Sequence, residues 1–465
     1  MDEFWNAWGS VANEPESVPL RKTLIEKANS LAQNFQLFDT RLSEFRENLN
    51  KQIVDEVKEI NDFSSEISLL NKQVQQLESR GRPANDARDQ REQAIKSLSE
   101  KLEIKWFEDE KGILEVQIAN GQNLVHGREY YKLNPIKSAE ADGDIRLSLE
   151  RPPGLDTDIT EIIRGGAIKE YINQRDGNIR EFHANLNEMV NEIASRINQI
   201  HSTGTGIKGI KLSETGYVTF DPELQELPVA DLKSGTFELK MIDEDNNIEE
   251  TLTIDIEAGV DTSKTIVEKI NRAAGAYEET LEGKEILKEK NWLLAKVNEN
   301  GSISINSGMG KRFIFGNDNT NTFSKFGLNS FFHLTNGAKD IRVNPELMED
   351  EMKVAAGSDL IPGDNEIALK IAELALTSTM MDESITFNEF YGKQITDVGL
   401  KVQDAQKGLS SHNQMLEQYE AIQNSISGVN LDEEMTNMVK YQRAYESSAR
   451  FLSTINEMTQ TVINM

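Results

Sequence analysis

Residues 20–80, LRKTLIEKANSLAQNFQLFDTRLSEFRENLNKQIVDEVKEINDFSSEISLLNKQVQQLESR, decide the fold. Their apolar side chains recur alternately three and four residues apart, which is the spacing of one face of a helix. A helix of about 60 residues spans about 90 Å, so the sequence predicts an elongated helical bundle. The stripe comprises Leu24, Ala28, Leu31, Phe35, Phe38, Leu42, Phe45 and Leu49, then Ile53, Ile60, Phe63, Ile67, Leu70, Val74 and Leu77.

The chain that follows alternates between helical and strand patterns. Gly81-Arg82-Pro83 ends the long helix, and a second helix starting near Asn85 should pair with it antiparallel. Residues 104–150 contain short alternating runs that predict strands, and one helix is expected over about 166–201. Residues 205–345 are rich in Gly, Thr and Asn, with strands expected at 237–241, 251–256, 293–297 and 302–305. Helices are expected again at 366–376, at 387–426 and from 431 to the end.

This order predicts an α+β fold. We expect an elongated antiparallel helical bundle built from both chain ends, with inserted β-rich domains and a C-terminal helix that forms a coiled coil. The predicted segments are a helical core in three parts (1–105, 155–204 and 346–427), a small β subdomain (106–154), an inserted β-rich outer domain (205–345) and a C-terminal axial helix (428–465).

Composition excludes several classes of function. The formal net charge is −29, which argues against nucleic acid and against an anionic membrane as partners. The chain has no cysteine, so disulfides, thiolate nucleophiles and Cys-ligated metals are excluded. The start, Met1-Asp2-Glu3-Phe4-Trp5, lacks the features of a signal peptide, and an exported chain would therefore use a route without a cleaved signal.

Two motifs resemble ligand sites and fail on context. Residues 204–209, GTGIKG, match G-x-G-x-x-G, but a helix precedes them where a dinucleotide site needs a strand, so we interpret them as a flexible boundary. Residues 243–247, DEDNN, start like a calcium loop but have Ile248 where the sharp turn needs Gly. None of the five histidines lies three to five residues from another. We predict no catalytic residue, cofactor or metal, although a Ser–His–Asp constellation assembled across the fold stays open.

The last helix has an unusually broad apolar face. Met438, Tyr445 and Leu452 are seven residues apart, and Phe451 and Met465 are among the residues that widen the stripe. Such a face needs a partner helix, and we see none upstream in this chain. The predicted interface consists of Leu431, Met438, Tyr445, Leu452, Ile455, Met458 and Val462.

Several segments resemble flagellar proteins. Residues 427–434 (SGVNLDEE), followed by 441–445 (YQRAY), resemble the C-terminal motif shared by flagellar rod, hook and hook-associated proteins. Residues 4–8 (FWNAW), 85–91 (NDARDQR) and 165–168 (GGAI), with 326–332 (FGLNSFF) and 362–365 (PGDN), resemble the hook-associated protein 1 family in particular. Members of that family begin with a further segment that includes a terminal helix, which would be the partner of 431–465, and we expect this sequence to start after it.

The resemblance implies a structural protein and not an enzyme. It implies an extracellular ring of subunits that joins the flagellar hook to the filament and is required for filament assembly. The implied partners are the hook protein, hook-associated protein 3, further copies of the chain and a flagellar export chaperone on the C-terminal helix. The implied route is the flagellar type III export system. The alternatives are another axial protein (hook, distal rod or flagellin-like), or an axial protein whose outer domain at 205–345 binds a ligand or catalyses a reaction.

Overall fold

The computed structural model describes the 465-residue chain except for 119, 139–142, 151–155, 215–227, 280–284, 288–291, 299–302, 309, 428–430 and 464–465. The described chain forms two compact units, Met1–Phe390 and Tyr391–Met465, which are treated separately below. The first holds all of the described strands and the second consists of two helices. The fold is α+β, as the sequence predicts.

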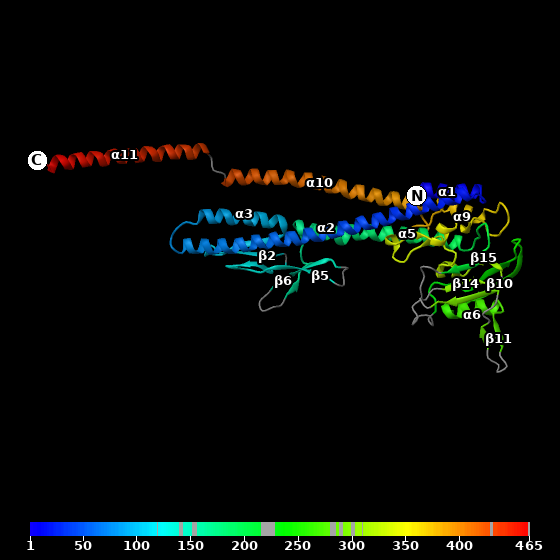
Figure 1. Ribbon diagram of the computed structural model, residues 1–465. Helices are drawn as coiled ribbons and strands as arrows, with labels where there is room; N and C mark the ends of the chain where they lie inside the picture. The colour runs from blue at the N-terminus through cyan, green and yellow to red at the C-terminus, as the bar shows by residue number, and fades with distance from the viewer. Residues whose placement is uncertain are drawn as a thin grey trace. The chain divides into compact units, whose positions relative to one another are not determined.

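The long helix of the first unit is α2 (Val18–Glu78), a single helix of 61 residues (Figure 1). It follows the short helix α1 (Asp2–Asn13), and Pro19 occupies its first turn, where no N–H partner is needed. The helix α3 (Asn85–Lys101) turns back along its last third, which confirms the antiparallel pair. Arg88 of α3 stabilises the pair, because its guanidinium binds Glu78 of α2 at 2.7 Å. It also binds Glu108, which follows α3 in the chain, at 2.6 Å.

The predicted stripe on α2 is wrong at two positions. Leu24, Ala28 and Phe35 are buried, but Phe38 and Phe45 are 48% and 51% exposed. A straight helix has 3.6 residues per turn, so a strict seven-residue repeat drifts by about 20° per heptad and leaves the buried face. Asp39 takes the buried position after Phe35, and its carboxylate lies 2.6 Å from His183 Nε2.

Two small antiparallel sheets pack on the middle of α2 and confirm the strands expected at 104–150. The first has the order β1-β2-β3-β4 and the second β5-β6-β7. Their inward side chains, such as Val116 and Leu147, join Val57 and Ile60 of α2 in one apolar cluster. The strands are β1 (Ile104–Glu108), β2 (Leu114–Ile118), β3 (Asn123–His126), β4 (Glu129–Tyr130), β5 (Leu133–Lys137), β6 (Ile145–Leu149) and β7 (Thr157–Asp158).

The helix expected over 166–201 is interrupted. It consists of α4 (Ala167–Asn173), the π-helical turn η1 (Gln174–Ile179) and α5 (Arg180–His201). The extra residue of a π turn changes which side chains face inward. In η1 the turn carries Arg175, which is 2% exposed and donates to Asn50 Oδ1 and the Ile145 carbonyl at 2.8 Å.

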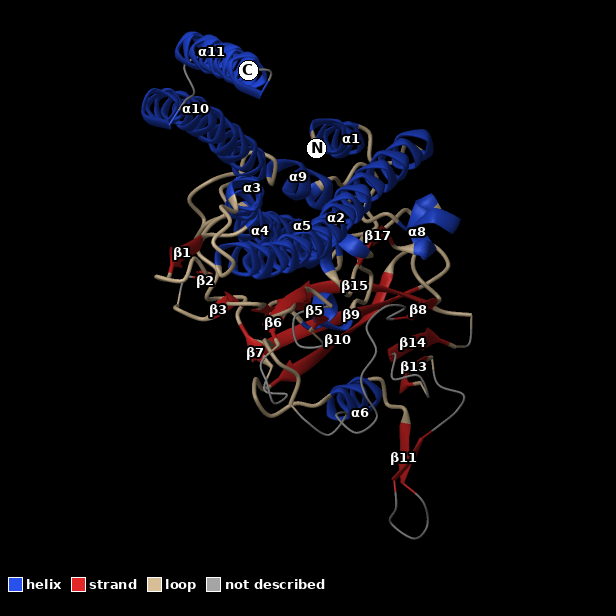
Figure 2. Cartoon of the chain, turned by 90° about the vertical axis from the view of Figure 1, so that its left-hand side faces the viewer, coloured by secondary structure: helices blue, strands red, loops and turns tan. Residues whose placement is uncertain are grey.

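The β-rich region after α5 has its own apolar cluster, from Ile210 to Leu328. Its three-stranded sheets have the orders β10-β9-β15 and β13-β14-β8, and α6 packs against β10 and β13 (Figure 2). The four expected strands are confirmed within the described residues, which exclude Ser302, whereas α6 was not predicted. The elements are β8 (Leu212–Glu214), β9 (Gly235–Ile242), β10 (Ile248–Ile256), α6 (Ser263–Ala273), β11 (Tyr277–Glu279), β12 (Glu285–Leu287), β13 (Leu293–Val297), β14 (Ile303–Ser307), β15 (Arg312–Asp318) and α7 (Thr322–Phe326).

The glycines between α5 and the β-rich region are tightly packed, so the expected flexible boundary is wrong. A Cβ on Gly206 would lie 2.1 Å from the Met352 carbonyl oxygen. Thr205, which lies between Gly204 and Gly206, forms a β-bridge with Gly357. Glycine is required here because two backbones touch.

Residues 331–390 complete another apolar cluster together with α1, the start of α2 and the end of α5. We call it the first apolar cluster. Trp8, Phe331 and Phe332 are fully buried at its centre. The core is therefore assembled from segments more than 300 residues apart. The returning elements are β16 (Phe332–His333), η2 (Gly337–Lys339), β17 (Arg342–Val343), α8 (Pro345–Glu349), η3 (Glu351–Lys353) and α9 (Glu366–Glu373).

Two long helices follow, α10 (Phe387–Ser427) and α11 (Leu431–Ile463). The first four residues of α10 belong to the first unit, where Phe387 and Phe390 are buried. Thr386 and Glu389 form a capping box, because the Glu389 carboxylate accepts from Thr386 N at 2.8 Å and Glu389 N donates to Thr386 Oγ1 at 3.2 Å. The predicted break at Gly428 lies outside the described residues.

Candidate assembly surface

The helix α11 carries a continuous stripe of exposed apolar side chains. Met438, Tyr445 and Leu452 are 60%, 77% and 66% exposed and stand seven residues apart. Ile455, three residues after Leu452, is 43% exposed. A repeat of seven with a second residue three positions later is the pattern of a coiled-coil seam. The structure thus places these four predicted residues on one face of one helix.

The remaining three predicted residues are Leu431, Met458 and Val462. They lie in α11, but their side chains are outside the described residues. Sequence reasoning missed Tyr441, which is 74% exposed and lies three residues after Met438, in the same relation as Ile455 to Leu452. The seven-residue repeat could have identified it.

A second stripe runs along α10 beyond Phe390. Tyr391, Ile395, Val398, Val402, Leu409, Leu416 and Tyr419 follow each other at intervals of three, four or seven residues, and each is at least 36% exposed. The helix is predicted from the sequence, but the predicted interface does not include these residues. In the described part of Tyr391–Met465, every large apolar side chain whose burial is described is exposed. The two helices therefore have no core of their own.

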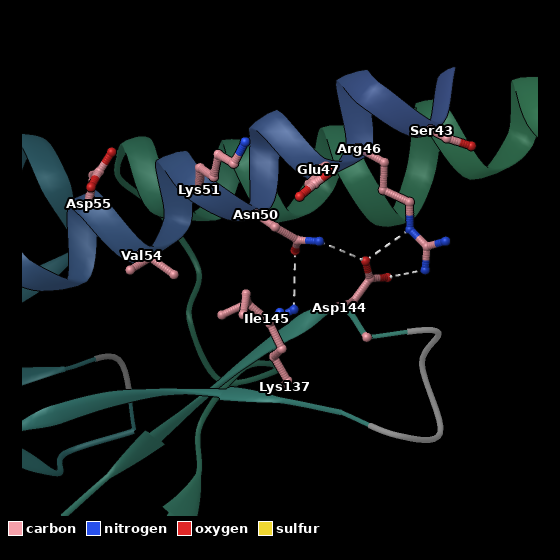
Figure 3. Close-up of a pocket in the computed structure, with 11 residues that line it drawn as sticks. Ser43, Arg46, Glu47, Asn50, Lys51, Val54, Asp55, Lys137, Asp144 and Ile145 are labelled. Carbon is pink, nitrogen blue, oxygen red and sulfur yellow. Dashed lines mark hydrogen bonds and ion pairs between the residues drawn. The ribbon is translucent and has the colours of Figure 1, made fainter. Parts of the chain in front are cut away.

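The first unit also contains a hollow of about 670 Å³ between α2 and the start of β6 (Figure 3). Its floor is Asp144, whose carboxylate accepts from Arg46 at 2.8 and 2.9 Å and from Asn50 Nδ2 at 3.2 Å. Burial alone would raise the pKa of Asp144, but the hydrogen bonds from Arg46 and Asn50 and the nearby Arg175 lower it.

The charges around this hollow are already balanced. Three cations, Arg46, Lys51 and Lys137, stand with three anions, Glu47, Asp55 and Asp144. The Asp144 network connects α2, β6 and η1, because Arg175 reaches Asn50 and the Ile145 carbonyl from the π turn. This network holds the sheet of β5, β6 and β7 against α2.

Two further features are absent from the part of the chain that the structure describes. No set of three or more His, Asp or Glu side chains there is placed to hold a metal ion. Among the same residues, no helix has the length and apolar character to cross a bilayer. The two stripes on α10 and α11 expose large apolar side chains to water, and such side chains require a partner that buries them.

Comparison with known proteins also indicates an assembling protein. The family model "Flagellar hook-associated protein FlgK helical domain" matches residues 1–217, and "Flagellar basal body rod FlgEFG protein C-terminal" matches residues 423–465. Flagellar hook-associated protein 1 of Escherichia coli K12 is 22% identical over 471 residues, covering 100% of this chain and 80% of the relative. The Salmonella typhimurium protein of that name is 23% identical over 477 residues, with the same coverage.

A more distant relative and a solved structure agree. Flagellar hook-associated protein 1 of Bacillus subtilis is 22% identical over 469 residues, covering 100% of this chain and 75% of the relative. The structure of the flagellar hook junction protein FlgK from Burkholderia pseudomallei has a TM-score of 0.55 and 14% identity, covering 91% of this chain and 93% of that one, which supports the fold.

A folded unit followed by two helices with exposed heptad stripes defines an axial subunit of the flagellum, a structural class of protein that self-assembles and contacts other flagellar components. Residues 1–217 match the FlgK helical-domain family, and the whole chain is similar to members of the flagellar hook-associated protein 1 family. This family works at the flagellum, in the junction between hook and filament.

Proposed function

We propose that this hook–filament junction protein builds its joint by burying the stripes of α10 and α11 against helices of neighbouring subunits. The observation that supports this is the exposure of Met438, Tyr441, Tyr445 and Leu452 on one face of α11. Burying one such side chain contributes about 1.5–3 kcal/mol. A stripe repeated over five turns of helix therefore supplies enough energy to hold subunits in a ring.

The proposed partners follow from the two ends of such a joint. One side contacts the hook protein and the other contacts hook-associated protein 3, while further copies of the chain complete the ring. The segments most suited to these contacts are α10 and α11, since the large apolar clusters of Met1–Phe390 are already buried. The division into six segments at 105, 154, 204, 345 and 427 stays a prediction.

Before assembly, the same stripe needs protection from water. An apolar face of this size promotes aggregation when it is exposed. We therefore propose that a flagellar export chaperone covers α11, including Leu431, Ile455, Met458 and Val462, until the chain is exported through the type III system without a cleaved signal. The role is mechanical, and we assign no enzymatic activity to any part of the chain.

The test is a single charge in the stripe of α11. Tyr445→Asp or Leu452→Asp places a carboxylate at the centre of the proposed interface, where burial without a partner is costly. In cells with the variant as the sole copy of this protein, we expect hooks without filaments. Electron microscopy of detached flagella and immunoblots of secreted flagellin give the readout.

The matched control is Ser453→Asp, which adds the same group on the polar side of α11, in line with Glu446 and Arg450, where Ser453 is exposed. This variant should assemble normal filaments. If Tyr445→Asp and Leu452→Asp cells carry normal filaments, the stripe is not the interface. If Ser453→Asp also blocks assembly, the effect belongs to the helix as a whole and not to its apolar face.

A further inference from the structure

The segment between α9 and α10 contains an unusual backbone turn. Met381, Asp382 and Glu383 have φ values of 51°, 56° and 61° in succession. In this left-handed region the Cβ of an L-residue crowds the following carbonyl oxygen, so glycine is the residue that adopts it without strain. Aspartate tolerates it better than most residues, but methionine and glutamate do not. The closed turn therefore stores strain at two of its three positions.

Local hydrogen bonds hold the turn closed. Thr379 N and Met380 N both donate to the Ile385 carbonyl at 3.0 Å, and Ser384 N donates to the Met380 carbonyl at 3.0 Å. Met380 is 2% exposed and anchors the turn in the first apolar cluster. These bonds join residues at most six apart, so they can break together without disturbing the rest of the core.

A link from the turn to another element is weak. Arg196 of α5 lies 3.2 Å from Glu383 Oε1, but the Glu383 side chain is 69% exposed and Arg196 also binds Glu192 at 2.6 Å. Ion pairs with this exposure contribute little to stability. The turn is therefore closed mainly by its own backbone bonds and by Met380.

The turn directly precedes a well-packed helix start. Phe387 is fully buried and stacks on Trp5 with ring centroids 6.0 Å apart, and Phe390 is 3% exposed. Phe390 N donates to the Thr386 carbonyl at 2.9 Å, which closes the first turn of α10. The strained residues thus lie next to the point where α10 is fastened to the core.

We propose that Met381–Glu383 is a strained latch at the root of α10. Strain makes the closed turn easier to open than the packed elements on either side. Opening removes the backbone bonds between 379 and 385 and allows the first turn of α10 to leave the aromatic contact with Trp5 while the rest of the core stays folded. The helix that carries the exposed stripe can then change its direction at this point.

Hydrogen exchange followed by mass spectrometry on the full chain tests the latch. The variant Met381→Gly/Glu383→Gly removes both strained Cβ atoms, and the matched control Met381→Ala/Glu383→Ala removes the same side chains but keeps Cβ. We expect the amides of Thr379, Met380, Ser384 and Ile385 to exchange about tenfold more slowly in the glycine variant than in the alanine control. The Phe390 amide should slow with them.

Cooperative thermal unfolding of both variants establishes that the core is intact. Equal or faster exchange in the glycine variant would overturn the proposal, because the turn would then store no strain. A Phe390 amide that does not follow the turn would also overturn it, since opening would not free α10. Exchange of the four turn amides of the unaltered chain only at the rate of global unfolding would have the same consequence.

Discussion

At the scale of single residues, His201 is fixed by contacts that no local pattern contains. Its Nδ1 lies 2.8 Å from the Asn329 carbonyl oxygen, and its Nε2 accepts from Ala355 N at 2.9 Å. The ring is therefore neutral, with its proton on Nδ1. Burial lowers the pKa of His201 to about 4.

This pKa gives a pH dependence with a definite sign. Between about pH 6.5 and 4 the unfolded chain binds a proton at His201 that the folded chain does not, so the free energy of unfolding falls as the pH falls, by up to about 1.4 kcal/mol per pH unit. His201→Gln should be less stable at pH 7 by about 1–3 kcal/mol but should lose less stability on acidification. Urea titrations at pH 7, 6 and 5 measure both.

The comparison isolates His201 because the other groups are common to both proteins. Burial lowers the pKa of His333 to about 3, and its contribution remains in the variant. If the two proteins lose stability in parallel from pH 7 to pH 5, His201 does not stay neutral in the folded core.

The burial of a residue could be predicted from the sequence where it depends on the spacing of apolar residues along one helix, and not elsewhere. Leu24, Ala28 and Phe35 are buried as the stripe indicates, because each depends on its own helix face. Phe38 and Phe45 are exposed because the buried face of α2 rotates away from the strict repeat. The partners of His201 come from 128 and 154 residues away, so nothing in its neighbourhood indicates them.

At the scale of elements, Gly206 in a loop and Gly9 in a helix have opposite roles. A Cβ on Gly206 would meet the Met352 carbonyl oxygen at 2.1 Å, whereas a Cβ on Gly9 of α1 would meet nothing within 4 Å. Gly206→Ala should lower the free energy of unfolding by about 3 kcal/mol through displacement of η3. Gly9→Ala should raise it by about 0.5–1 kcal/mol, because alanine favours a helix interior.

Denaturant unfolding of both variants beside the unaltered chain checks this pair. Gly206→Ala with unchanged stability would mean that the backbone at Gly206 does not touch the backbone of η3 at Met352. Gly9→Ala with lower stability would place Gly9 in a tighter environment than the structure gives.

A helix or strand could be predicted when the neighbouring sequence determines it, and could not be predicted when a contact with a distant residue does. The long helix α2 and the hairpin of β9 and β10 follow from apolar periodicity and turn residues, which a sequence displays directly. The π turn η1 was not predicted, because its extra residue serves the contact of Arg175 with Asn50, 125 residues away. The stripe on α11 was recognised because it repeats every seven residues, although Tyr441 was overlooked.

At the scale of the whole molecule, the first unit should fold without α11. Deleting residues 428–465 removes α11, in which no described side chain is buried. We expect the shortened chain to keep its cooperative thermal transition, with a midpoint shift of no more than about 2 °C, and to lose binding to the export chaperone. Calorimetry with a chaperone pull-down checks both, and a shortened chain without a cooperative transition would contradict an independent α11.

The central claim is that this protein is the structural joint between hook and filament. Deleting its gene tests that claim most directly, with electron microscopy of the cells and immunoblotting of the medium for flagellin. We expect complete hooks without filaments and unpolymerised flagellin in the medium, and we expect filaments to return when the gene is restored. Filaments of normal length on the deleted cells would contradict it.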